Sequence, residues 1–310
     1  MSDSAQTLRG SIDGAATPAR VRDYIDLLKP RVMSLVVFTG WVGVLIAPVH
    51  LHSFKAALAV LAIALGSGAA GAINMWYERD LDALMARTRN RPLPAGRVAP
   101  DDALGLGVLL SLFSVLLMAV STNLVAAALL AAAILFYVFV YTIWLKRRTP
   151  QNIVIGGAAG AFPPMIGWAA ATGDVSSVGI ALFLLVFLWT PPHFWALALY
   201  RSEDYRRAGV PMLPVVAGPR ETKRHMVIYT LLLLPVALAP TLLGAVGWVY
   251  GAVALALSLG FIGHAIAVWR TADDETAFGA ARRMFRYSLI YLAVLFAALP
   301  VDLVVSRIAG

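Results

Sequence analysis

Three oxygen-bearing side chains in the first third of the chain have a spacing that suits metal chemistry. Asn74, Glu78 and Asp82 follow one another at four-residue steps, which in a helix puts them on one face with neighbouring Cβ atoms about 5–6 Å apart. Mg²⁺ prefers such oxygen ligands and usually completes its shell with water and substrate phosphate. The spacing predicts an open magnesium site that depends on phosphate, and Asp80, on the other side of the helix, is assigned to a salt bridge. The alternative is that these acids only solvate a helix end.

A second candidate group lies in the segment that follows residue 190. His193, Tyr200 and Asp204 are separated by seven and four residues, so they share a helical stripe on which His193 lies about 16 Å deeper than Asp204. We predict that Asp204 binds a metal ion. His193 is interpreted either as a contact to a large second substrate, for example as a proton acceptor or an axial ligand, or as a buried histidine that hydrogen-bonds to a neighbouring helix.

Basic side chains follow both acidic groups and could neutralise a phosphate. A Lys-Arg-Arg run also ends an apolar stretch, and its alternative role is a stop signal for membrane insertion. The segment that comes next, 149–164, is rich in glycine, alanine and proline, so it can pack closely or leave room for a ligand. The candidate diphosphate-binding residues from this pattern are Arg87, Arg91, Lys146, Arg147 and Arg206.

The composition shows which elements must position these residues. Of 310 residues, 60% are hydrophobic and 14% charged, with a mean hydropathy of +0.78, which lies outside the range of soluble domains. Apolar runs long enough to cross a bilayer as helices recur along the chain, and helices satisfy their own backbone in lipid. Cysteine is absent, which excludes thiolate metal sites. The predicted spans are 32–50, 54–75, 103–121, 123–145, 152–171, 177–200, 226–246, 248–269 and 285–306.

The charges orient these nine spans. With the N-terminus in the cytoplasm, every one of the 25 Lys and Arg residues except Lys55 and Arg307 falls in a cytoplasmic segment, as the positive-inside rule predicts. The net charge of +8 is therefore explained by topology, and no nucleic-acid partner is expected. We expect residues 1–31 to form a polar, unstructured cytoplasmic tail, and residues 32–306 a transmembrane domain whose long cytoplasmic loops, 76–102 and 201–225, carry the active face.

Two further expectations concern organisation and location. The two long loops are four helices apart and share an acidic, then basic, then proline-containing pattern, which suggests two four-helix repeats plus one helix. The N-terminal segment has no apolar core typical of a secretory signal, and its acidic residues are unusual for a mitochondrial presequence. We therefore expect a multi-pass protein of a bacterial inner membrane.

These residues resemble the UbiA superfamily of intramembrane prenyltransferases, most closely its protohaem IX farnesyltransferase (haem O synthase) branch. The similarity runs from about residue 25 to 300. Glu78 stands where the superfamily pattern usually has Asp, and Tyr200 stands where relatives often have Asp, which leaves the ligand set of the second site open. The segments that carry the resemblance are 29–31, 74–82, 85–96, 141–147, 152–157 and 191–198.

The resemblance implies an all-α membrane protein with nine helices around a central cavity. It implies two Mg²⁺ ions that bridge farnesyl diphosphate, haem b as the prenyl acceptor, and a haem-modifying or oxidase-assembly partner. It adds Lys29 to the diphosphate-binding residues, Tyr200 to the catalytic set, and His193 and Trp195 as acceptor contacts. An allylic cation would need a dry aromatic surface, for which Trp76, Tyr77, Phe194 and Trp195 are candidates.

Two other functions remain open from the sequence. The diphosphate motifs also fit a prenyltransferase that acts on an aromatic acid or a quinone precursor. A secondary transporter could likewise have a two-fold repeat and polar residues inside the membrane, but it would release no diphosphate.

Overall fold

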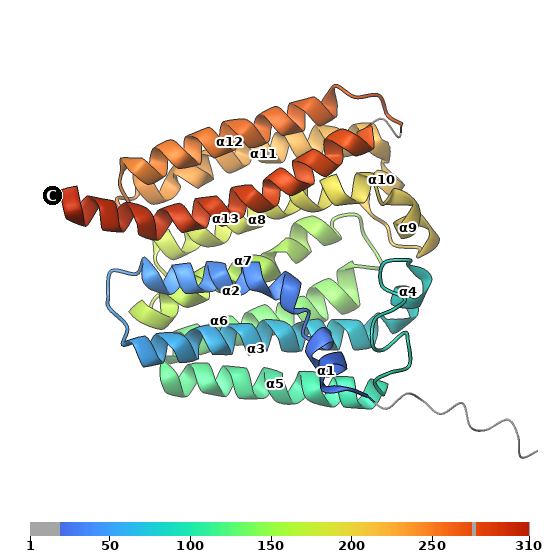
Figure 1. The fold of residues 1–310 in the computed structure, drawn as a ribbon, viewed down its shortest axis with the longest axis horizontal. Coiled ribbons are helices and arrows are strands. Elements are labelled where there is room, and N and C mark those ends of the chain that lie inside the picture. Colours follow the sequence, from blue (N-terminus) through green and yellow to red (C-terminus); the bar gives the residue numbers. More distant parts are fainter. Residues whose placement is uncertain (1–18, 275–276, 310) are drawn as a thin grey trace, which may run out of the picture.

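The computed structural model describes residues 19–274 and 277–309, and all the regular structure in these ranges is helical. Figure 1 shows long helices that run roughly side by side, with the short helices α4, α9 and α10 gathered at one end of the bundle, which we call the motif end. The helices are α1 (Val21–Leu27), α2 (Pro30–Leu45), α3 (Ser53–Tyr77), α4 (Arg79–Leu84), α5 (Pro100–Ser121), α6 (Leu124–Leu135), η1 (Phe136–Leu145), α7 (Asn152–Thr172), α8 (Ser177–Leu199), α9 (Ser202–Arg207), α10 (Leu213–Val216), α11 (Gly218–Leu242), α12 (Trp248–Trp269) and α13 (Ala277–Ala309).

Most of these helices are long and apolar enough to cross a bilayer. In the described part of the chain eight spans meet this condition, with α6 and η1 counted as one, and α1 together with α2 would make a ninth that is bent by 54°. The expected all-α membrane architecture is therefore confirmed, while the count of nine and the cytoplasmic N-terminus stay predictions.

Several predicted boundaries were wrong. The expected unstructured tail, 1–31, contains helix α1 from Val21, and its first eighteen residues lie outside the described range. The loop 201–225 contains α9 and α10, and α11 begins at Gly218 rather than at 226. Helices α1, α9 and α10 have only seven, six and four residues, which is too few to give a periodic hydrophobic signal in the sequence.

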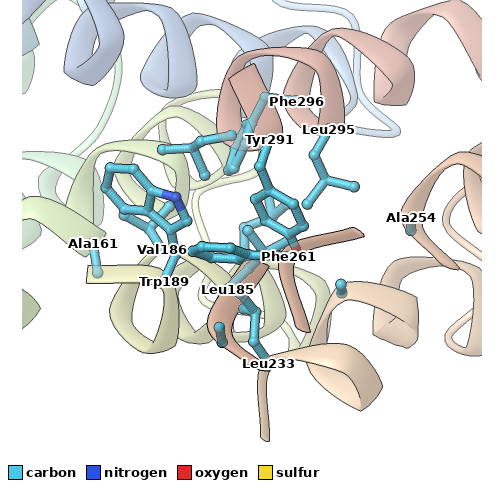
Figure 2. Close-up of a cluster of buried hydrophobic side chains, with 14 of the residues drawn as sticks. Ala161, Leu185, Val186, Trp189, Leu233, Ala254, Phe261, Tyr291, Leu295 and Phe296 are labelled. Carbon is cyan, nitrogen blue, oxygen red and sulfur yellow. The ribbon is translucent and has the colours of Figure 1, made fainter. Parts of the chain in front are cut away.

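Apolar packing forms two large buried groups that meet at α7. One joins α3, α5, α6 and η1 to α7, and the other joins α2, α7, α8, α11, α12 and α13. Figure 2 shows the second group, where Trp189 of α8, Phe261 of α12 and Tyr291 of α13 come together. The exposed surfaces of these helices are also apolar. Buried polar and charged side chains are therefore the ones that indicate a functional site.

Helices α2 and α7 cross with their backbones in contact. A Cβ atom on Gly167 would lie 1.9 Å from the Gly40 carbonyl oxygen, and one on Gly43 would lie 2.1 Å from the Pro164 carbonyl oxygen. Only glycine permits such an approach, which is a common way to join helices in membranes. Within the segment 149–164, an added Cβ on Gly156 would lie 2.2 Å from the Tyr141 ring, whereas one on Gly160 would meet nothing within 4 Å, so the segment packs closely at some positions and is open at others.

One buried carboxylate lies far from the motif end. Asp302 of α13 is fully buried and accepts the backbone N–H groups of Gly247 and Tyr250, the latter at 3.0 Å. These amides belong to the first turn of α12, so a side chain of one helix caps the N-terminus of another. This acid is accounted for by structure and is not a candidate for the site.

Candidate active site

The first predicted motif lies at the motif end, where α3 leads into α4. Glu78 is the junction of the two helices, and the backbone keeps helical spacing across it, because Glu78 N–H donates to Asn74 O at 3.0 Å and Asp82 N–H donates to Glu78 O at 2.8 Å. The three side chains are 2%, 1% and 4% exposed for Asn74, Glu78 and Asp82. The motif is therefore a buried polar face and not a solvated helix end.

Asn74 links two other elements to this face. Its Oδ1 accepts a hydrogen bond from Lys29 Nζ at 2.7 Å, and its Nδ2 donates to Thr142 Oγ1 at 3.1 Å. Thr142 belongs to the π-helix η1, a rare conformation that is often found at functional sites. The sequence did not single out Thr142, although a polar residue inside an apolar run is a signal of a lined cavity or of helix pairing.

Lys29 has the backbone conformation that brings it to the site. It is the one non-glycine residue with positive φ in the described chain, at φ 52°, and it forms the bend between α1 and α2. Pro30 follows and disfavours right-handed helical φ/ψ at Lys29. Left-handed residues other than glycine, asparagine and aspartate carry strain and cluster at functional sites. The bend directs the Lys29 ammonium group onto the Asn74 face, as expected of a diphosphate-binding residue.

Glu78 pairs with Lys146, and one of its oxygens has no partner. Lys146 Nζ donates to Glu78 Oε2, whereas Glu78 Oε1 is buried without any hydrogen bond. Asn152 Oδ1 is a second buried oxygen without a partner, and the Asn152 amide donates to Thr149 O at 2.7 Å. Buried oxygens are costly when left unpaired, so this region has unused acceptor capacity.

Asp82 is held by the loop that follows it. Arg91 Nη1 donates to both Asp82 carboxylate oxygens, at 3.0 and 2.8 Å, and the buried Thr88 hydroxyl donates to Asp82 O at 2.8 Å. These contacts fold the loop back over the first motif. Arg87, another predicted phosphate ligand, is exposed on the same loop.

Asp80 behaves as predicted from its place on the opposite side of the helix. Arg147 donates to its two carboxylate oxygens at 2.7 and 2.9 Å and stacks over the Tyr77 ring at 5.1 Å. The Arg147 hydrogen bonds lower the pKa of Asp80 below its usual value. Arg147, expected on the diphosphate, is thus already paired on this outer face.

The second motif makes fewer contacts of this kind. Asp204 lies 3.7 Å from Arg201, and Arg206 pairs at 2.5 Å with Glu203 in an exposed position, so Arg206 does not reach the first motif. Tyr200 ends α8 and is half-buried.

An apolar contact joins the two motif loops. Met85, which follows α4, packs in one buried group with Tyr205, Val210 and Met212 from the segment after α8. The group also contains Ile153 of α7. Segments that are about 120 residues apart in the sequence therefore meet at the motif end (Figure 1).

The donor set at the first motif suits a cation that is completed by phosphate. The described residues hold no group of three His, Cys, Asp or Glu side chains that could bind a metal ion by themselves. The unpartnered Glu78 Oε1, beside the oxygens of Asn74 and Asp82, offers the hard ligands that Mg²⁺ takes. Such a face fits an ion whose remaining ligands come from water and substrate.

His193 lies deeper in α8 and is enclosed by aromatic rings. Its ring stacks on Trp189 at 4.3 Å and on Phe285 at 4.7 Å, with Phe194 edge-on at 5.1 Å. The Ser288 hydroxyl donates to Phe285 O at 2.7 Å, so its oxygen is left to accept from His193 Nδ1 at 2.6 Å. This arrangement assigns the proton of the neutral ring to Nδ1 and leaves Nε2 as the acceptor nitrogen.

Trp195 does not share this environment. Two residues along a helix turn by about 200°, so Trp195 faces the other way; it packs edge-on against His225 and Tyr229 of α11. The two predicted acceptor contacts therefore lie on different faces of α8, and the assignment of Trp195 to the acceptor stays a prediction. Phe285 and Ser288 of α13, which the sequence did not single out, are the actual neighbours of His193.

A cavity of about 240 Å³ also opens at the motif end, between α11 and α12. Lys223, which is 1% exposed, lies in its wall and donates to Thr271 O, Ala272 O and Asp273 Oδ1 at 3.0, 2.7 and 2.9 Å. The ammonium group is fully bonded and closes the C-terminal end of α12. None of the predicted site residues lines this cavity.

A helical bundle with membrane-length apolar helices and a buried acidic and basic site at one end fits an intramembrane transferase, and the chain belongs to the UbiA prenyltransferase family, whose model matches residues 35–289. Relatives carry a more specific name. Proteins named protoheme IX farnesyltransferase are 57% identical in Granulibacter bethesdensis, over 96% of this chain and 95% of the relative, and 56% identical in Parvibaculum lavamentivorans, over 97% and 96%. The family expected from the sequence is confirmed.

Solved structures show the same fold. A digeranylgeranylglyceryl phosphate synthase superposes with a TM-score of 0.75 at 18% identity, covering 91% of this chain and 97% of its own. A UbiA homolog from Archaeoglobus fulgidus bound to DMAPP and Mg²⁺ gives 0.67 at 18% identity, covering 89% of this chain and 99% of its own. At these identities the likeness establishes the architecture alone.

Proposed function

We propose that this protein transfers a farnesyl group from farnesyl diphosphate to a vinyl group of haem b, makes haem O and releases diphosphate. The observation that carries the proposal is the 53–57% identity, over nearly the full chain, to proteins named protoheme IX farnesyltransferase. The paired buried face at the motif end supports the diphosphate half of the reaction, and the aromatic surroundings of His193 support the acceptor half.

The diphosphate half rests on residues of the first motif. Asn74, Glu78 and Asp82 would hold Mg²⁺, bound as two ions by analogy with the resemblance, and the bound metal would neutralise the charge that develops on the departing diphosphate. Lys29 and Arg91 already point at the same face. We propose that, when the substrate binds, Lys29 leaves the Asn74 amide oxygen and Arg91 leaves the Asp82 carboxylate, and that both side chains then bind phosphate oxygens. Phosphate carries more negative charge than either protein partner.

The second motif is assigned a smaller share. Asp204 is held only by a long contact to Arg201, so its carboxylate can turn toward a second ion at little cost. Arg206 and Arg147 remain on outer ion pairs, and we therefore assign them to loop structure rather than to the diphosphate.

The reaction balances without a redox step. The bond between the farnesyl carbon and the diphosphate oxygen breaks with its electron pair on oxygen, and the vinyl π electrons of haem form the new carbon–carbon bond. Water then adds to the cation left on the haem side chain and loses a proton. The buried aromatic groups around His193 exclude bulk water from the allylic cation until the acceptor captures it.

Location and partners belong to the same proposal. We propose that the motif end lies on the cytoplasmic side of a bacterial plasma membrane, and the distribution of basic residues supports this orientation. A haem-modifying or oxidase-assembly partner would receive the product, since haem O is too apolar to leave the membrane freely.

The test is a direct assay with the purified protein in lipid vesicles. Incubation with haem b, farnesyl diphosphate and Mg²⁺ should yield a pigment whose mass equals haem b plus a farnesyl group and a hydroxyl group, with one diphosphate released per product. Prenylated hydroxybenzoate without farnesylated haem would favour the quinone-precursor alternative, and solute uptake without diphosphate release would favour a transporter. Asp204→Ala should lower turnover by about a hundredfold while the protein stays folded in the membrane; a near-normal rate would remove Asp204 from the metal site.

A further inference from the structure

Three arginines surround the aromatic end of α8, and the proposed diphosphate site does not use them. The Arg282 guanidinium lies 5.3 Å from the Tyr200 ring centroid, and that of Arg201 lies 5.9 Å from it. Arg286 is one helical turn beyond Arg282 and within electrostatic range of the Tyr200 hydroxyl. The tyrosine ring thus lies between Arg201, the N-cap residue of α9, and the arginines of α13.

These three arginines have few ionic partners among the described residues. Within the described ranges, neither Arg282 nor Arg286 forms an ion pair with an acid, and both are exposed. Arg201 has only its 3.7 Å contact with Asp204. By contrast, the following cations each have a close acceptor: Lys29, Arg91, Arg97, Lys146, Arg147 and Lys223.

A continuous row of aromatic rings leads from these arginines into the membrane. Tyr200 meets Phe285 edge-on at 6.3 Å, Phe285 stacks on His193 at 4.7 Å, and His193 stacks on Trp189 at 4.3 Å. The row is braced from α13, since Trp189 Nε1 donates to Ser288 O at 2.8 Å. From Arg282 to Ser288 the axis of α13 rises by about 9 Å, so the row is charged at the interface and apolar at depth.

We infer that Arg282 and Arg286, assisted by Arg201, form a carboxylate subsite for the prenyl acceptor. This inference rests on the proposed function and names the part of the acceptor that is recognised. Haem b is a flat apolar macrocycle with two carboxylates on one edge, and it matches a row of rings that ends in exposed guanidinium groups without an acidic partner among the described residues. Guanidinium binds carboxylate through two parallel hydrogen bonds, and this contact would hold the carboxylate edge at the interface while the rest of the macrocycle extends toward His193.

The subsite also separates the two substrates. Farnesyl diphosphate has its charge on the phosphates, which the Asn74 face addresses through Lys29 and Arg91. The arginines of α13 address a different anion on a different helix. The arginines of α13 would therefore bind a molecule with carboxylates and a broad aromatic body, whereas the Asn74 face of α3 would bind a molecule with a diphosphate.

The experiment compares haem b with its dimethyl ester, which has no charged carboxylate. In vesicles of zwitterionic lipid, the wild-type protein should reach half-saturation with haem b at about a tenfold lower concentration than with the ester. The double variant Arg282→Gln and Arg286→Gln should lose this preference, with the half-saturating concentration of farnesyl diphosphate unchanged. The control is Arg283→Gln, which also removes an exposed arginine from this part of α13, where the electrostatic partner of Arg283 is His264 of α12.

Three results would overturn the inference. One is equal use of haem b and its ester by the wild-type protein, a result that does not depend on whether any variant folds. Another is a double variant that keeps the preference of Arg283→Gln. The last is a double variant whose rates fall equally for haem b and ester and recover with anionic lipid, which would mean that the arginines hold lipid phosphates. A wild-type protein that farnesylates neither compound would instead refute the proposed function itself.

Discussion

The substitution Glu78→Gln tests the proposed metal face most directly. It keeps the size of the side chain and an oxygen for Lys146, but it removes the charge from a carboxylate that is 1% exposed and has one oxygen without a partner. A hydrogen bond or ligand contact to a charged group contributes about 1.5–3 kcal/mol, which corresponds to about ten- to a hundredfold in affinity. We therefore expect the Mg²⁺ concentration for half-maximal diphosphate release to rise by that factor.

The assay is a Mg²⁺ titration of diphosphate release at saturating farnesyl diphosphate and haem b. Asp80→Asn is the matched control, since it removes the same charge two residues away, where the partner Arg147 lies on the exposed outer side. The control should keep its Mg²⁺ requirement within about twofold of wild type, as expected of surface ion pairs. If Glu78→Gln and Asp80→Asn respond alike, Glu78 serves only to pair Lys146 and the metal assignment fails.

Three further predictions concern the acceptor, the helix crossing and pH. His193→Ala should raise the half-saturating concentration of haem b more than that of farnesyl diphosphate; equal effects in steady-state titrations would make this histidine structural. Gly167→Ala should lower the melting temperature in detergent, because its Cβ would overlap a carbonyl oxygen at 1.9 Å and overpacking costs about 1–3 kcal/mol, whereas Gly160→Ala, with nothing within 4 Å, should not. The pKa of Asp80 is lowered in the folded state, because Arg147 donates hydrogen bonds to its carboxylate. The pair should therefore stabilise the protein fully above the unfolded pKa of about 4 and lose that effect as pH falls through the folded pKa. A difference in melting temperature between wild type and Asp80→Asn that persisted below the folded pKa would contradict this.

The first motif could be predicted because its geometry is local. Four-residue steps on one helix bring Asn74, Glu78 and Asp82 together whatever surrounds them, and the same periodicity put Asp80 on the other side. The helical membrane architecture was predictable for a similar reason, since lipid allows few alternatives to apolar helices.

What the sequence could not supply depends on how helices pack. Lys146 reaches Glu78 and Lys29 reaches Asn74 across separations of 68 and 45 residues, and both contacts depend on conformations without a sequence signature, the π-helix and the left-handed bend. The neighbours of His193 come from α13, so only the packing of α8 on α13 reveals them. That His193 and Trp195 lie on different faces of α8 follows from helical geometry alone, since two residues turn the chain by about 200°.

The crossing of α2 and α7 has a consequence for how substrates enter. Because carbonyl oxygens and glycine Cα atoms touch there with no side chain between them, the two helices cannot slide or tilt against each other without losing the contact. The two helices therefore form a rigid pair, and Lys29 lies at the N-terminus of α2 as its N-cap residue. Any gate that admits a molecule as wide as a porphyrin must therefore open between other helices, and spin labels on α2 and α7 should keep one distance through the whole catalytic cycle.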